Sequence, residues 1–113
     1  MSAITTHILD TSRGRPAGGI RVVLEVRGDG GWEILGQGRT DADGRLRDLL
    51  PADFNLRAGV YRLTFATSDY FAAERIESFY PEVAISFIVT DTAAHYHVPL
   101  LVSPFGYSTY RGS

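Results

Sequence analysis

Apolar and polar residues alternate along most of the chain, and turn residues separate the alternating segments at short intervals. Every second position is apolar in four segments, at residues 20–26, 61–65, 85–89 and 96–102. This alternation is typical of strands that bury one face. The sequence Asp29-Gly30-Gly31 predicts a hairpin turn that returns the chain through a strand from Trp32 to Gly38. A final short strand is expected from Tyr107 to Arg111.

One segment departs from the alternation and predicts a short helix. Thr67-Ser68-Asp69 supplies an N-cap signal and an early acid, and the following residues, 70–75, end in a base. Pro81 then releases the chain into the next strand. The pattern predicts an all-β fold, a two-sheet antiparallel sandwich of seven to eight strands with one short helix, in which residues 1–113 form a single domain.

Composition narrows the function classes. The chain has no Cys, which excludes disulfides, thiolate nucleophiles and zinc or iron–sulfur sites built on Cys. A net charge of -2 provides no general field to attract nucleic acid. The apolar runs are too short for a membrane span, and no basic stretch leads into a long apolar run as in a signal peptide. We therefore expect a cytoplasmic protein without nucleic-acid or membrane partners.

The three histidines are expected on the outer faces of strands. If Ile4, Thr6 and Ile8 point inward, alternation places His7 and Leu9 outward. The same argument turns His95, His97 and Leu101 outward in the late strand, and Ser108 and Tyr110 in the last one. A surface that mixes imidazoles with leucines is unfavourable for a monomer, so we expect another subunit to cover it.

Plainer interpretations stand beside each candidate. A surface His is most often a solvated side chain, and Arg45 in Asp41-Ala42-Asp43-Gly44-Arg45 is compatible with a turn Arg paired with an Asp. Tyr110 is compatible with simple packing. His95, His97 and His7 resemble a zinc ligand set, but neither Cys nor a carboxylate supports it, so no metal is expected. For Asp10 we favour a structural role in a turn.

Three blocks together resemble one enzyme family. They are Thr6-His7-Ile8-Leu9-Asp10-Thr11 with Gly14-Arg15-Pro16-Ala17, the segment 38–45 (GRTDADGR), and the segment 95–113 (HYHVPLLVSPFGYSTYRGS). The chain is similar over nearly its whole length to the 5-hydroxyisourate hydrolase family, the transthyretin-related enzymes of urate breakdown. The ending Tyr-Arg-Gly-Ser separates these hydrolases from the hormone-carrying transthyretins.

The resemblance implies a homotetramer of transthyretin-like sandwiches with active sites in a channel at the dimer–dimer interface. It implies no cofactor, and it transfers catalytic roles to His7, Arg45 and His97. The resemblance assigns substrate binding to the C-terminal tail, Tyr110, Arg111, Gly112 and Ser113. The outward face of the last strand adds Ser108 as a further candidate for substrate binding. His95 receives no catalytic role and is expected at the channel rim or in a supporting position.

The implied reaction is hydrolysis of 5-hydroxyisourate to 2-oxo-4-hydroxy-4-carboxy-5-ureidoimidazoline. A neutral imidazole can take a proton from water near neutral pH, and a guanidinium can stabilise the oxyanion. Sequence leaves open whether His7 or His97 is the base. Two other classes also stay open, a transthyretin-like carrier of a small ligand without catalysis and a purely structural β-sandwich module.

Overall fold

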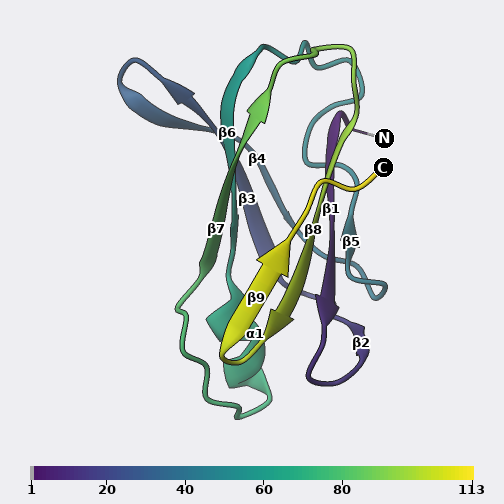
Figure 1. The fold of residues 1–113 in the computed structure, drawn as a ribbon, viewed down its shortest axis with the longest axis vertical. Helices are drawn as coiled ribbons and strands as arrows, with labels where there is room; N and C mark the ends of the chain where they lie inside the picture. Colours follow the sequence, from purple (N-terminus) through teal and green to yellow (C-terminus); the bar gives the residue numbers. More distant parts are fainter. Residues whose placement is uncertain (1) are drawn as a thin grey trace.

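Two β-sheets face each other in the computed structural model, which describes residues 2–113 (Figure 1). One sheet has the strand order β4-β3-β6-β7, and the other has the order β2-β1-β8-β9 with β5 also paired to β1. The strands are β1 (Ile4–Asp10), β2 (Arg15–Pro16), β3 (Arg21–Gly28), β4 (Gly31–Arg39), β5 (Arg45–Leu46), β6 (Gly59–Phe65), β7 (Val83–Val89), β8 (Tyr96–Ser103) and β9 (Gly106–Thr109). The predicted all-β sandwich is confirmed, but residues 2–113 form nine strands instead of seven to eight, because the two-residue strands β2 and β5 are too short to show alternation.

The pairing of β1 with β8 is parallel, with Ile4 opposite Tyr96 and Asp10 opposite Val102. The other strand pairs described are antiparallel, as expected. Alternation sets which face of a strand is buried but not its direction, and no hairpin joins these two strands, which lie at opposite ends of the sequence. Our expectation of a wholly antiparallel sandwich was therefore wrong for this pair.

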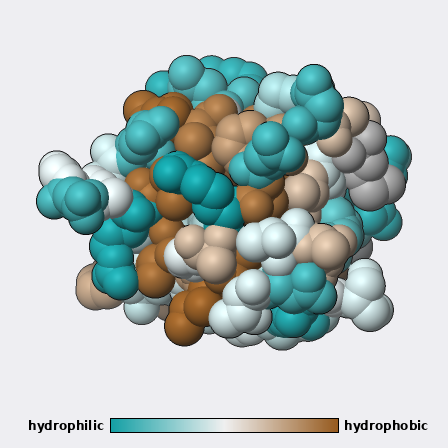
Figure 2. Space-filling view, turned by 90° about the horizontal axis from the view of Figure 1, so that it is seen from above, coloured by the Kyte–Doolittle hydropathy of each residue, from teal (hydrophilic) through white to brown (hydrophobic). Residues whose placement is uncertain are grey.

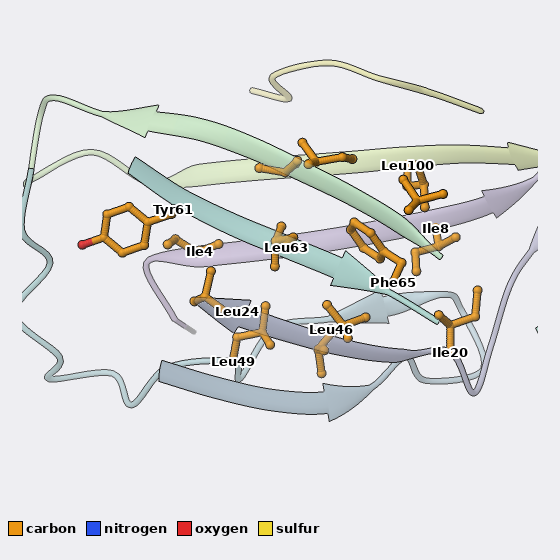
Figure 3. Close-up of a cluster of buried hydrophobic side chains, with 14 of the residues drawn as sticks. Ile4, Ile8, Ile20, Leu24, Leu46, Leu49, Tyr61, Leu63, Phe65 and Leu100 are labelled. Carbon is orange, nitrogen blue, oxygen red and sulfur yellow. The ribbon is translucent and has the colours of Figure 1, made fainter. Parts of the chain in front are cut away.

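The inward faces of both sheets form one core (Figure 3). Figure 3 shows Leu24, Leu63 and Phe65 of one sheet facing Ile4 and Ile8 of the other, and each of these side chains is fully buried. The inward sets predicted for β3, β6 and β8 are confirmed, whereas Phe87 in β7 is only half-buried. Seen from above, hydrophobic side chains show between hydrophilic ones over the left and middle of the molecule and reach its lower edge (Figure 2).

The predicted helix is present as α1 (Thr67–Ala73), at the lower end of the sheets in Figure 1. Its start differs from the expectation, because Ala66 is the N-cap and no side chain caps the helix. The Ala66 amide instead donates to the Arg21 carbonyl at 3.0 Å, which ties the helix start to β3. Arg75, expected in the last turn, lies beyond the helix end. No helix within residues 2–113 has the length and apolarity to cross a bilayer.

Asp10 ends β1 and connects it to the helix. Its buried carboxylate accepts from the Ser12 amide at 3.0 Å, the Ser12 hydroxyl at 2.5 Å and the Tyr70 hydroxyl at 2.8 Å. Burial alone raises the pKa of Asp10, but these hydrogen bonds outweigh it and hold the pKa below 3.8. The same contact and burial raise the pKa of Tyr70 to about 12. The structural role predicted for Asp10 is confirmed.

We expect Asp10→Asn to lower the free energy of unfolding at pH 7 by about 2–4 kcal/mol. The NH₂ group of Asn replaces one acceptor oxygen of the carboxylate, so a buried hydrogen-bond donor loses its acceptor. The difference in free energy of unfolding between the unmutated chain and Asp10→Asn should shrink as the pH falls from the unfolded-state pKa of Asp10, about 3.9, through its lower folded-state pKa. Below these values Asp10 is protonated, and protonation favours the unfolded state. Urea unfolding at fixed protein concentration measures both effects. Asp53→Asn, at an exposed position, is the control, and an equal loss in the two variants would contradict the assignment.

Candidate active site

Three strands bring the predicted catalytic residues onto one outer face. The parallel register sets Thr5 opposite His97 and His7 opposite Pro99. On the other side of β1, β5 sets Arg45 opposite His7. Residues opposite each other in a sheet point to the same side, so Thr5, His7, Arg45 and His97 share the face that the core does not use. The outward direction predicted for both histidines is confirmed.

A cavity of about 240 Å³ opens on this face. It is lined by the polar or charged residues Thr5, Arg45, Arg47, His95, His97 and Ser113. Arg45 and Arg47 also line a neighbouring hollow of about 530 Å³. The structure thus brings Arg45, His97 and Ser113 of the predicted site into one cavity, with His7 beside Arg45 on the adjoining strand.

A tight turn positions Arg45. The Asp41 carboxylate accepts hydrogen bonds from the amides of Asp43 at 2.9 Å and Arg45 at 3.0 Å. The bond from Arg45 contributes most to holding the pKa of Asp41 below its ordinary value. Gly44 has φ +76°, and a Cβ there would lie 2.4 Å from the Ile8 carbonyl oxygen, so only glycine fits. His7 Nε2 donates to the Asp43 carbonyl at 2.9 Å, which fixes the imidazole to the same turn.

His97 is held by Thr5 and by its neighbour His95. Thr5 Oγ1 lies 2.8 Å from His97 Nδ1 and 3.1 Å from His95 Nε2. The two rings stack with centroids 6.4 Å apart and planes 16° apart. Burial, followed by the positive charges of His95, His7 and Arg45, lowers the pKa of His97 below 6.5. His97 is therefore neutral at physiological pH and able to accept a proton.

The C-terminal tail closes over His97. The Gly112 amide donates to the His97 carbonyl at 2.8 Å, and a Cβ on Gly112 would lie 2.6 Å from His97 Cδ2. The tail therefore approaches the ring as closely as a glycine allows. The Arg111 guanidinium stacks on the Tyr96 ring at 4.5 Å, which anchors the segment beside the core. Gly112 and Ser113 thus lie at the site, whereas the Arg111 side chain points elsewhere.

The chain alone does not bring Ser108 and Tyr110 to this cavity. Ser108 is exposed on β9 opposite Leu101. Tyr110 is 59% exposed and lines, with Arg111, a separate hollow between β7 and β8. Their predicted contact with substrate stays a prediction.

The sequence argument overlooked Thr5 and Arg47, although each lies two positions from a residue that it selected. Two-residue spacing on a strand is the available signal, because it places Thr5 on the face of His7. Within the described part of the chain, no group of three His, Asp or Glu side chains is arranged to hold a metal ion. The polar groups of the cavity are suited to proton transfer and to the stabilisation of negative charge on oxygen.

Comparison with known proteins gives this arrangement a family. The model of the family described as HIUase/Transthyretin matches residues 4–112. The chain belongs to this family. A curated relative, the 5-hydroxyisourate hydrolase of Caulobacter vibrioides, is 49% identical over 117 residues, an alignment that covers 100% of both chains.

The solved structures that resemble this chain include a 5-hydroxyisourate hydrolase and a transthyretin. The 5-hydroxyisourate hydrolase of Klebsiella pneumoniae superposes with a TM-score of 0.86 at 42% identity, covering 100% of this chain and 94% of the other. Transthyretin from Sparus aurata gives a TM-score of 0.91 at 30% identity, covering 99% and 97%. The backbone matches the transthyretin at least as well as the hydrolase, so the side chains of the site have to distinguish the two.

We expect an NMR titration to place the pKa of His97 below 6.5 and Arg45→Ala to raise it, because removing a nearby cation makes protonation easier. The chain has three histidines, so loss of one signal in His97→Asn assigns the resonance. Arg27→Ala, an exposed site on the other sheet, is the matched control. A His97 pKa that Arg45→Ala leaves in place would contradict the coupling.

Proposed function

We propose that the chain, acting as one domain, hydrolyses 5-hydroxyisourate. The observation that carries the proposal is the convergence of His7, Arg45 and His97 on one sheet face, with Arg45 and His97 lining one cavity, in a chain 49% identical to a 5-hydroxyisourate hydrolase along its full length. The product is 2-oxo-4-hydroxy-4-carboxy-5-ureidoimidazoline, and the reaction belongs to urate breakdown.

The chemistry requires a base, an oxyanion partner and a proton donor. Water attacks the ring amide carbonyl, the C–N bond breaks, and the departing nitrogen takes up a proton. His97 and His7 share the proton transfers, because a neutral imidazole accepts a proton and an imidazolium returns it. Arg45 stabilises the negative charge that develops on the carbonyl oxygen, and its planar fork of N–H donors suits a ring rich in amide groups.

The tail contributes substrate contacts. Ser113 lines the cavity, and the Gly112 backbone packs on the His97 ring. Ser108 and Tyr110 supply hydrogen bonds to the ring of the substrate in the assembled protein, and Arg111, stacked on Tyr96, fixes the path of the tail that follows them. No metal or cofactor enters these steps.

The working form is a homotetramer whose active sites lie at the dimer–dimer interface. Support comes from the outer face that carries the site, where Leu9 and Leu101 lie opposite each other and are only half-buried in the single chain. A second protomer on this face would remove that apolar surface from water and enclose the cavity. We propose the cytoplasm as the place of action, which cell fractionation tests.

The alternative is a transthyretin-like carrier that binds a small ligand without catalysis, and the TM-score of 0.91 to transthyretin keeps it open on grounds of fold. Two arginines and two histidines around the cavity make a poor lining for an apolar ligand. An ultraviolet assay of freshly generated 5-hydroxyisourate separates the two. A hydrolase accelerates its decay catalytically, whereas a carrier at most binds it in proportion to protein. Chelator treatment in the same assay tests the alternative that His7, His95 and His97 bind a catalytic zinc ion.

In that assay, His97→Asn and Arg45→Ala should each lower kcat/KM by about 10²–10⁴, the range for loss of a general base or an oxyanion donor. Arg27→Ala serves as the control for the loss of one positive charge. Tetramer content, measured by light scattering, should be unchanged in all three variants. Losses below about tenfold for both site variants would contradict the assignment.

Replacing Leu101 by Glu should break the assembly, because it places a charge in the proposed subunit contact. We expect smaller oligomers by size-exclusion chromatography with light scattering, and a loss of activity in parallel. Ile34→Glu, at an apolar position of the opposite sheet that is 58% exposed, should keep both. A tetrameric and active Leu101→Glu variant would exclude this face as the interface.

A further inference from the structure

One hydroxyl lies between two imidazoles at the site. Thr5 Oγ1 is 2.8 Å from His97 Nδ1 and 3.1 Å from His95 Nε2, both within hydrogen-bond distance. Thr5 is 3% exposed, so its hydroxyl proton is screened from solvent and has to go to one of these two nitrogens. The other nitrogen then carries a proton of its own and donates to the hydroxyl oxygen.

Counting protons leaves two arrangements. In the first, His97 Nδ1–H donates to Thr5 and Thr5 donates to His95 Nε2, which leaves a lone pair on His97 Nε2. In the second, the order is reversed and His97 Nε2 carries a proton. The first makes His97 a base at Nε2, and the second makes it a donor.

The surroundings of His97 Nε2 favour the first arrangement. Within residues 2–113 this nitrogen has no hydrogen-bond partner, and no unpartnered side-chain nitrogen or oxygen is buried, so it is open to the cavity. Arg45 and Arg47 line that cavity, and guanidinium groups donate hydrogen bonds without accepting any. A lone pair facing two cations is favourable, whereas an N–H dipole facing them is not.

We propose that Thr5 and His95 form a positioning relay, from His97 Nδ1–H to the Thr5 hydroxyl to His95 Nε2, that keeps His97 Nε2 unprotonated as the general base. The role of His97 as a general base rests on the proposed hydrolase function. The order of hydrogen bonds in the relay does not, because it is a property of the folded chain. Thr5 and His95 touch His97 and act through it, so they are positioning residues.

The contacts of His7 also support the assignment of His97 as the general base. A backbone carbonyl only accepts, so His7 Nε2 carries the proton that it donates to Asp43 at 2.9 Å. That nitrogen is engaged in holding the turn before Arg45. His97 has the opposite arrangement, with its Nδ1 held and its Nε2 free. Of the two histidines, His97 is therefore the one whose Nε2 is available to a water molecule.

The direct test is the tautomer of His97, read from ¹⁵N–¹H correlation spectra of the whole chain labelled with ¹⁵N-histidine at a pH above the imidazole range. We expect a proton on Nδ1 and none on Nε2. A proton on Nε2 would overturn the proposal. This readout needs no substrate, so absence of hydrolysis by the native protein would refute the proposed function and leave the relay standing.

Thr5→Val removes the hydroxyl and nearly preserves the shape of the side chain. We expect the His97 tautomer to shift toward Nε2–H and kcat to fall about 10- to 100-fold with little change in KM, while Thr5→Ser recovers most of both. Thr6→Val is the matched control, because Thr6 donates a buried hydrogen bond to the Val98 carbonyl at 2.6 Å from the core face of the same strand. Thr5→Val with a native tautomer and native kcat would refute the relay.

Two variants of His95 test the relay independently, in case Thr5→Val does not fold. The amide oxygen of Gln in His95→Gln can accept the Thr5 proton, so the His97 tautomer should stay as in the native chain. His95→Phe keeps a flat ring for stacking but has no acceptor, and the tautomer should shift toward Nε2–H. Equal spectra for the two variants would show that His95 does not orient His97.

Discussion

The parallel pairing of β1 with β8 is the constraint on which the site depends. It joins the two ends of the sequence, so that Thr5 meets His97 across 92 positions of the chain. The same alternation that buries Ile4, Thr6 and Ile8 forces Thr5 and His7 outward, so the core and the site are two faces of one strand. A register slip by one residue would exchange these faces, so burial of the apolar set also fixes which residues face the candidate site.

Charge is distributed so that the site arginines stay available. Within residues 2–113, the arginines paired with carboxylates are Arg13 and Arg62, both away from the cavity. Asp41, four positions before Arg45, accepts hydrogen bonds from two backbone amides of the turn. Arg45 and Arg47 line the cavity and make it attractive to developing negative charge. Burial, the neighbouring histidines and Arg45 lower the pKa of His97.

Sequence alone predicted the features that depend on local periodicity. The inward sets of β3, β6 and β8 and the outward histidines follow from spacing, the hairpin at Asp29–Gly31 and the helix near Thr67 from local residue types, and the structure confirms them. The direction of β8 against β1, the start of α1 at Ala66 and the bridging position of Thr5 depend on contacts between distant segments, which no spacing encodes. Spacing places Thr5 on the face of His7, but threonine is common in strands, so its position between two imidazoles was not apparent before its partner strand was known.

The fold shared with transthyretin shows why such a small group matters. A sandwich with TM-scores of 0.91 to a transthyretin and 0.86 to a hydrolase does not discriminate by backbone shape. An imidazole and a guanidinium at the mouth of a cavity are also insufficient, because a histidine in the wrong tautomer presents a proton where a base is needed. One hydroxyl proton between two rings decides that tautomer. In the proposed mechanism, catalysis therefore depends on which nitrogen of His97 carries a proton. Thr5 and His95 set this, and neither belongs to the proposed catalytic residues.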